Sequence, residues 1–168
     1  MSQHHLASVI AHENDLVFER FDEEIAFEIG STIRELARAE HLGIVCDIRF
    51  WDRQLFYMAL PGTSADNPDW VRRKINVVKR FGKSSYRMVL ERKATPQNRA
   101  FPADSGLSAA DYVLAGGGFP IRIKNVGVVG AITVSGVPEH LDHMLVVRGI
   151  CQHLGINAES YAYDGGSA

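Results

Sequence analysis

Apolar residues recur every three or four positions between Asp22 and His41, at Ile25, Ile29, Ile33, Leu36 and Ala37. This spacing places an apolar stripe on one face of a helix and predicts that the stripe packs on a core. Asp22 stands where its carboxylate can accept hydrogen bonds from the first free N–H groups of that helix. We therefore expect an amphipathic helix over residues 22–41.

The apolar period then changes to two, which is typical of strands. Apolar and polar residues alternate over residues 44–50 and 55–60, on either side of a polar turn. A second pair of such segments follows later, at residues 119–124 and 126–135. Residues 126–135 are apolar nearly throughout, as expected of a central strand that is covered on both faces. The pattern predicts two β-hairpins.

A long helix is predicted between the hairpins. Asn67 can cap it, Pro68 suits its first position, and the helical pattern continues from Trp70 to about Arg92. Gly82 lies inside this stretch, where it lowers helix stability by about 1 kcal/mol relative to Ala. The glycine predicts either a kink or two shorter helices.

Two more helices complete the predicted order. A short helix is expected from Ser108, and a last one from Pro138 to a left-handed cap at Gly155, with Leu141 and Leu145 on its inner side. Hairpins separated by helices favour an α+β fold, in which an antiparallel β-sheet is flanked by α-helices, over a doubly wound parallel sheet.

The length of 168 residues is that of one domain, which we expect to span residues 1–168. Within it, residues 1–19 are expected to be a loosely packed N-terminal segment and residues 164–168 a frayed tail. No apolar run reaches the roughly 20 residues that a membrane helix needs, and no secretory leader is recognisable, so we expect a cytoplasmic protein. Cys46 and Cys151 lie among apolar neighbours, as reduced core thiols do.

Charge is distributed unevenly, although the formal net charge is only -2. Residues 69–99 hold ten basic and two acidic side chains, whereas residues 1–68 hold five basic and twelve acidic ones. The two regions can neutralise each other within a monomer or across a subunit interface. Alternatively, the basic helix can bind phosphate or carboxylate groups. No aromatic platform is interleaved with the basic residues, so nucleic acid is not an expected partner.

Two glycine motifs fail the tests for nucleotide-binding loops. Gly82-Lys83-Ser84 lacks the first glycine and the preceding strand of a P-loop, and Gly116-Gly117-Gly118 leads into a strand without the third glycine of a Rossmann fingerprint. The triple glycine can form a nest of N–H groups that binds an anion. Alternatively, it is a sharp turn into the strand that Pro120 fixes, and both interpretations stay open.

The last helix offers candidate acid–base residues. His140 and His143 flank Asp142, but no third metal ligand is apparent, so no metal site is expected. Surface histidines beside a first-turn carboxylate are the alternative, and a single histidine such as His143 is enough to ligate heme iron. Covalent catalysis is disfavoured because no nucleophile elbow surrounds the candidate serines, Ser84, Ser85 and Ser135.

Five segments carry a resemblance to a known family: WVRRK (70–74), FGKSS (81–85), GGGFPI (116–121), GAITVSG (130–136) and the pair Asp142-His143. They are similar to the heme-degrading-domain proteins, which are related to the glycolate-operon and extracellular heme-sensor groups. The resemblance implies a profilin-like fold, an α/β/α sandwich, assembly into homo-oligomers, and heme as a ligand. Carried over by position, the site residues are Arg73, Lys74, Ser84, Gly117, Gly118, Pro120, Asp142 and His143.

Three functions remain open from the sequence. The first is an oligomeric domain that binds a small anionic ligand, such as heme or a related tetrapyrrole, between the basic helix and the glycine turn. The second is an enzyme that acts on heme or on a small phosphorylated or carboxylated metabolite, with Asp142 or His143 as the general base. The third is a structural or partner-binding protein without a ligand.

Overall fold

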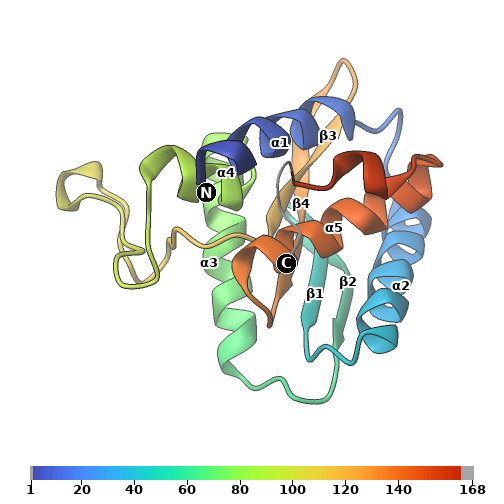
Figure 1. The fold of residues 1–168 in the computed structure, drawn as a ribbon, viewed down its shortest axis with the longest axis horizontal. Coiled ribbons are helices and arrows are strands. Elements are labelled where there is room, and N and C mark those ends of the chain that lie inside the picture. The colour runs from blue at the N-terminus through green and yellow to red at the C-terminus, as the bar shows by residue number, and fades with distance from the viewer. Residues whose placement is uncertain (1, 164–168) are drawn as a thin grey trace.

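The computed structural model describes residues 2–163, with side chains described from residue 5 onward. A four-stranded antiparallel sheet in the order β2-β1-β4-β3 forms the middle layer, and helices cover both of its faces (Figure 1). The two predicted hairpins are confirmed. The central pair is β1 and β4, in which Cys46 lies opposite Val134. The strands are β1 (Val45–Phe50), β2 (Arg53–Ala59), β3 (Gly118–Ile123) and β4 (Gly127–Ser135).

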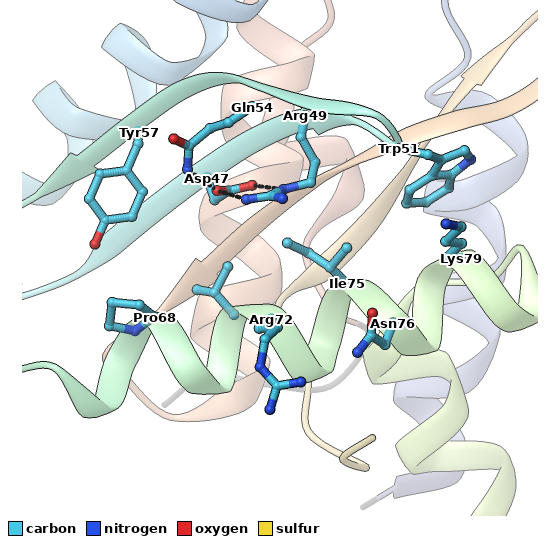
Figure 2. Close-up of a pocket in the computed structure, with 11 residues that line it drawn as sticks. Asp47, Arg49, Trp51, Gln54, Tyr57, Pro68, Arg72, Ile75, Asn76 and Lys79 are labelled. Atoms are coloured by element: carbon cyan, nitrogen blue, oxygen red, sulfur yellow. Dashed lines mark hydrogen bonds and ion pairs between the residues drawn. The ribbon is translucent and has the colours of Figure 1, made fainter. Parts of the chain in front are cut away.

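One face of the sheet is covered by α3 (Asp66–Phe81), which packs mainly on β3 and β4. Figure 2 shows Ile75 pointing from α3 toward the strands. A small apolar cluster joins the two layers, formed by Val71, Ile75 and Val78 of the helix with Val45 and Ala131 of the sheet. Because α3 lies over β3 and β4, the outer part of this face, on β1 and β2, stays partly open.

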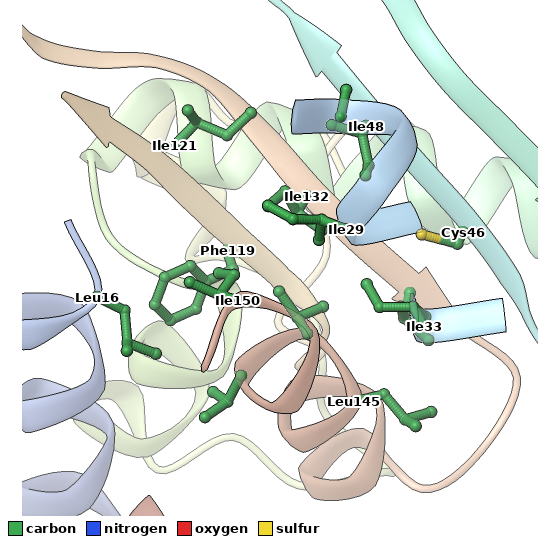
Figure 3. Close-up of a cluster of buried hydrophobic side chains, with 14 of the residues drawn as sticks. Leu16, Ile29, Ile33, Cys46, Ile48, Phe119, Ile121, Ile132, Leu145 and Ile150 are labelled. Atoms are coloured by element: carbon green, nitrogen blue, oxygen red, sulfur yellow. The ribbon is translucent and has the colours of Figure 1, made fainter. Parts of the chain in front are cut away.

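The other face carries the main hydrophobic core (Figure 3), under α2 (Glu23–Ala39) and α5 (Glu139–Leu154). The predicted cap is confirmed, since the Ile25 N–H donates to Asp22 Oδ1 at 2.9 Å. The two helices approach closely at Gly149, where a Cβ would lie 2.6 Å from Ile33 Cγ1. The left-handed cap at Gly155 is also confirmed, at φ 69°. The result is the expected α+β sandwich.

The prediction of a loosely packed N-terminal segment is wrong for the part that the structure describes. Residues Ser2–Asp15 form α1, which packs on α4 (Ser85–Arg92) and buries Val9 and His12. Phe18 then joins the sheet edge beside β3, donating to the carbonyl of Arg122 and accepting from the N–H of Lys124, both at 2.9 Å. Buried polar residues interrupt the apolar pattern of α1, which is why periodicity gave no helix here. The predicted frayed tail, 164–168, lies outside the described residues.

The structure decides between the two alternatives at Gly82 and corrects two other local predictions. The long helix breaks at Gly82, whose φ of 63° ends α3, so the interpretation as two helices is correct. Asn67 lies inside the first turn of α3 and does not cap it; its side chain instead accepts from the Ser64 N–H at 3.0 Å. Ser108 starts only a turn, and the nearby short helix is the 3₁₀ segment Ala103–Ser105.

Of the core residues expected from the sequence, the two cysteines are confirmed and Leu141 is not. Leu141 is 42% exposed, so the inner side of α5 is formed without it, by Leu145, Val146 and Ile150. Cys46 and Cys151 are buried free thiols, as predicted. A second short 3₁₀ segment, Ala158–Tyr161, follows α5. None of the helices within residues 2–163 has the length and apolar character required to cross a membrane.

We predict that Gly130→Ala weakens the sheet far more than Gly82→Ala. A Cβ on Gly130 would overlap the carbonyl oxygen of Arg49 and lie 2.9 Å from its carbon, whereas a Cβ on Gly82 meets nothing within 4 Å. Urea unfolding should show a loss of about 3 kcal/mol or more for Gly130→Ala. For Gly82→Ala, the free energy of unfolding should fall by about 1–2 kcal/mol, because alanine is disfavoured in the left-handed conformation. Similar losses would contradict the β1–β4 register.

Candidate functional site

A cavity of about 280 Å³ opens where the first half of α3 faces the end of β4 and the first turn of α5. We call it the Lys74–Asp142 pocket. The helix α3 supplies the ammonium of Lys74 and, at its start, the carboxylate of Asp66. The loop after α4 supplies a guanidinium, and the first turn of α5 supplies two more carboxylates. The groups that matter for its chemistry are Lys74, Arg99, Ser135, Gly136, Glu139 and Asp142.

A buried ion pair forms the inner wall of this pocket. The Lys74 ammonium donates to Asp142 Oδ2 at 3.1 Å and to the carbonyl of Val134 at 3.0 Å. Both charged side chains are only 3% exposed. Such a pair is costly to desolvate, and the loss of one partner leaves an uncompensated buried charge. Lys74 therefore stays fixed, tied to α5 and to the end of β4.

Burial shifts the pKa values of both partners toward their neutral forms. It lowers the pKa of Lys74, while the neighbouring Asp142 carboxylate acts in the opposite direction. It raises the pKa of Asp142 to about 6, although Lys74 and the N–H of Val137 act to lower it. Asp142 Oδ1 also accepts from that Val137 N–H at 3.1 Å, which closes the turn between β4 and α5. The carboxylate thus has a structural role in addition to any chemical one.

The glycine turn lies directly against the ion pair, as the sequence predicted for Lys74. Gly117 has a φ of 130°, and a Cβ there would overlap the carbonyl oxygen of Val134 and lie 2.8 Å from Lys74 Nζ, so a side chain at this position would disturb both the strand and the ammonium. Two of the three N–H groups of the turn are already engaged, because Gly118 N–H donates to Ser85 Oγ at 2.9 Å and Gly116 N–H to Glu139 Oε2 at 3.1 Å. The geometry favours the sharp turn over the anion nest.

A second ion pair stands at the mouth of the pocket. Arg99 Nη1 donates to Glu139 Oε2 and to the carbonyl of Leu114, both at 2.8 Å. Its side chain is 23% exposed, which makes it the accessible cation of this pocket. Its Nε and Nη2 have no partner among the described side chains. Sequence reasoning missed Arg99 because it lies in a loop, and its only signal was membership of the basic stretch 69–99.

Four of the predicted site residues, Arg73, Ser84, Pro120 and His143, lie elsewhere, so the expectation that all of them cluster around one pocket is wrong. Arg73 pairs with Asp69 at 3.0 Å and stacks on the ring of Trp70. Ser84 is buried and caps α4, accepting from the Arg87 N–H at 3.1 Å. Pro120 is buried within β3, opposite Ala131 of β4.

His143 does not line the pocket and is fully buried. Its Nε2 is 3.0 Å from Nδ1 of His12, whose Nε2 is 2.7 Å from the carbonyl of Tyr161. Because a carbonyl can only accept, His12 carries its proton on Nε2, and His143 must donate from Nε2 to His12 Nδ1. His143 Nδ1 is then an unprotonated nitrogen without a partner. The alternative that His143 is a surface histidine is wrong.

The histidine pair is held neutral by burial, which lowers the pKa of His12 and lowers that of His143 well below the usual value. His143 therefore cannot reach the pocket or act there as a base. Within the described residues, no group of three or more His, Cys, Asp or Glu side chains is arranged to hold a metal ion.

Comparison with known proteins supplies a family. The sequence model for a haem-degrading protein, HbpS-like, matches residues 21–151. A UPF0303 protein of Mesorhizobium japonicum is 57% identical over 152 residues, which cover 90% of each chain. The fold is similar to the crystal structure of the Ybr137w protein, with a TM-score of 0.80, 22% identity and 89% of each chain covered. It is also similar to a PduOC:heme complex, with a TM-score of 0.64 and 14% identity over 78% of this chain and 93% of that one.

We predict that removal of one ionic partner costs more than removal of both. Lys74→Met leaves Asp142 as a lone buried charge and should lower the free energy of unfolding by about 3–5 kcal/mol. Adding Asp142→Asn removes that charge and keeps an acceptor for Val137, so the double variant should recover part of the loss. Urea unfolding of the full double-mutant cycle measures this coupling. Additive losses would contradict the ion pair.

A second prediction concerns pH. A free histidine titrates near pH 6.5, so the lowered pKa values of His12 and His143 stabilise the fold above that pH. This stability should be lost as the pH falls below 6.5, by at most about 1.4 kcal/mol per pH unit for each histidine. The raised pKa of Asp142 acts with the opposite sign. The difference between the parent and His143→Leu isolates the histidine contribution, and identical pH profiles would contradict it.

Proposed function

The chain belongs to the family of haem-degrading, HbpS-like proteins, and from that premise we propose that it binds a small anionic ligand in the Lys74–Asp142 pocket. The ligand class is an organic carboxylate, for which heme, with its two propionates, is the candidate that the family suggests. The homo-oligomer expected from the sequence is part of the proposal, because subunits can extend a shallow pocket across an interface.

One observation carries the proposal: Arg99 lines the pocket with part of its guanidinium still unengaged. Nη1 holds Glu139 and the Leu114 carbonyl, and the remaining nitrogens are free to form a two-point contact with a carboxylate. Lys74 adds positive potential from the inner wall without moving, since Asp142 fixes it. A ligand carboxylate would exchange water for these donors, while Glu139 limits the pocket to ligands that tolerate a nearby negative charge.

The pocket fits the carboxylates of heme better than its iron. Among the residues whose side chains the structure describes, its lining contains no histidine, cysteine, methionine or tyrosine, the usual protein ligands of heme iron. His143, the sequence candidate for that role, is fully buried and does not line the pocket. Iron ligation is therefore not part of the proposal. The tetrapyrrole ring would lie at the rim, against Trp70 and Val137.

The second candidate function is that of an enzyme, and it rests on the properties of Asp142. A carboxylate whose pKa is raised to about 6 beside a pocket is suited to proton transfer near neutral pH. Asp142 would take the proton from a substrate held by Arg99, and the fixed Lys74 ammonium would stabilise the negative charge that develops. This role needs only the geometry already described.

We expect hemin and metal-free protoporphyrin to bind with similar affinity, because the carboxylates and not the iron are recognised. Arg99→Ala should weaken binding of both by about tenfold or more, the value of a hydrogen bond to a charged group. Arg34→Ala, an exposed arginine on α2 that lies outside the pocket, is the matched control. Titration followed by absorption and fluorescence measures both ligands, and native mass spectrometry of the same samples gives the subunit number.

The outcomes separate the alternatives. Absence of binding by both compounds would overturn the tetrapyrrole proposal, and binding of hemin alone would show that iron ligation dominates. Loss of the hemin absorption band in air with ascorbate, abolished by Asp142→Asn, would favour the enzyme. Persistence of the band in both proteins would exclude heme degradation.

A further inference from the structure

A second hollow lies on the open part of the sheet, between β1–β2 and the outer side of α3 (Figure 2). We call it the sheet-face pocket. It encloses about 200 Å³ and shares no lining residue with the Lys74–Asp142 pocket. Side chains of β1 at alternate positions form its upper wall, because Asp47, Arg49 and Trp51 project to the same side of the strand. Figure 2 shows Arg49 extending from the strand above Ile75 of α3.

Arg49 is immobilised in this pocket by a buried carboxylate. Its Nε and Nη2 donate to the two oxygens of Asp47 at 2.8 and 2.7 Å, and Gln54 donates to the same carboxylate at 2.6 Å. Asp47 is 2% exposed and Arg49 is 32% exposed. The guanidinium is thus held flat against the sheet, and its third nitrogen, Nη1, has no partner among the described residues. The two hydrogen bonds to Asp47 fix the orientation of the guanidinium and leave Nη1 available as a donor.

A second cation approaches from the helix. Lys79 lies 6.0 Å from the centre of the Trp51 ring, and no carboxylate of the described part of the chain pairs with it. Arg72, the other cation at the edge, is already held by Asp69 and Asp111. Asp47 neutralises only Arg49. The unpaired ammonium of Lys79 therefore gives the pocket an excess of positive charge.

The remaining surface is apolar and aromatic. Val71 and Ile75 form the floor on α3, and Trp51 and Tyr57 stand at the two ends of the strand wall. Figure 2 shows these two aromatic side chains on opposite sides of Arg49. Flat apolar groups gain from contact with such rings, and carboxylates gain from guanidinium and ammonium donors. Both features occur in one small hollow.

We infer that the sheet-face pocket is a binding site for a small planar carboxylate, separate from the pocket of the proposed function. Arg49 Nη1 and Lys79 Nζ bind the carboxylate, and the ring lies between the α3 floor and the strand aromatics. Asp47 and Gln54 do not touch the ligand; they position Arg49. The site would take an aromatic acid of about the size of benzoate.

The chain contains two tryptophans, Trp51 and Trp70, which makes a selective reporter available. In Trp70→Phe, the emission of Trp51 reports the sheet-face pocket alone, since Trp70 lines the other one. Benzoate should change this emission saturably, and the neutral analogue benzyl alcohol should not. Lys79→Met should weaken benzoate binding by about tenfold, while Arg80→Met, the neighbouring exposed cation outside the pocket, should leave it unchanged. Arg49→Lys, which keeps the charge facing Asp47, should also weaken it.

Several results would overturn this inference. These are equal responses to benzoate and benzyl alcohol, equal affinities of Lys79→Met and Arg80→Met, or an unchanged affinity in Arg49→Lys. Inorganic phosphate that competes as well as benzoate would show an anion site without a role for the ring. Trp51 emission that depends on protein concentration and not on benzoate would show that a second copy of the chain covers this face. Because Arg99→Ala leaves this pocket intact, failure here and failure of the proposed function are distinguishable.

Discussion

The buried ion pair between Lys74 and Asp142 is the interaction that organises one end of the molecule. A single amine and a single carboxylate connect the middle of α3, the last residues of β4 and the first turn of α5. Neither charge is stable at this depth without the other, so the three elements must come together at once. The residue at position 117 is a glycine because its φ of 130° disfavours a side chain, and because a Cβ there would overlap the Val134 carbonyl and crowd the Lys74 ammonium.

The two faces of the sheet have different tasks. Under α2 and α5 the side chains are apolar, and this layer provides most of the burial that stabilises the fold. Under α3 the sheet instead presents buried polar groups, among them Asp47, Thr133 and Ser135. Both pockets border α3, and each uses a buried carboxylate to fix a cation. The main hydrophobic core and the two proposed binding sites thus lie on opposite faces of the sheet.

Much of this architecture could be predicted from periodicity alone. The apolar stripe of α2 and the alternation in β1 and β4 directly encode burial on one or two faces, so these elements followed from the sequence. The helix α1 did not, because His12 and Glu13 are buried polar residues whose partners, His143 and Arg87, lie far along the chain. Arg99 was missed because it lies in a loop, where no periodicity marks a residue as part of a site. Lys74, Asp142 and Gly117 lie close together in the structure; the basic helix and the triple glycine suggested the first and last of these, and family resemblance added Asp142.

The single bridge that Phe18 makes beside β3 has a consequence for how copies of this chain can associate. It occupies hydrogen-bonding groups at that border of the sheet, whereas β2, at the opposite border, has no strand beyond it within the described residues. Unpaired strand borders are templates for joining chains. Antiparallel joining of two copies through β2 would form a closed twofold arrangement.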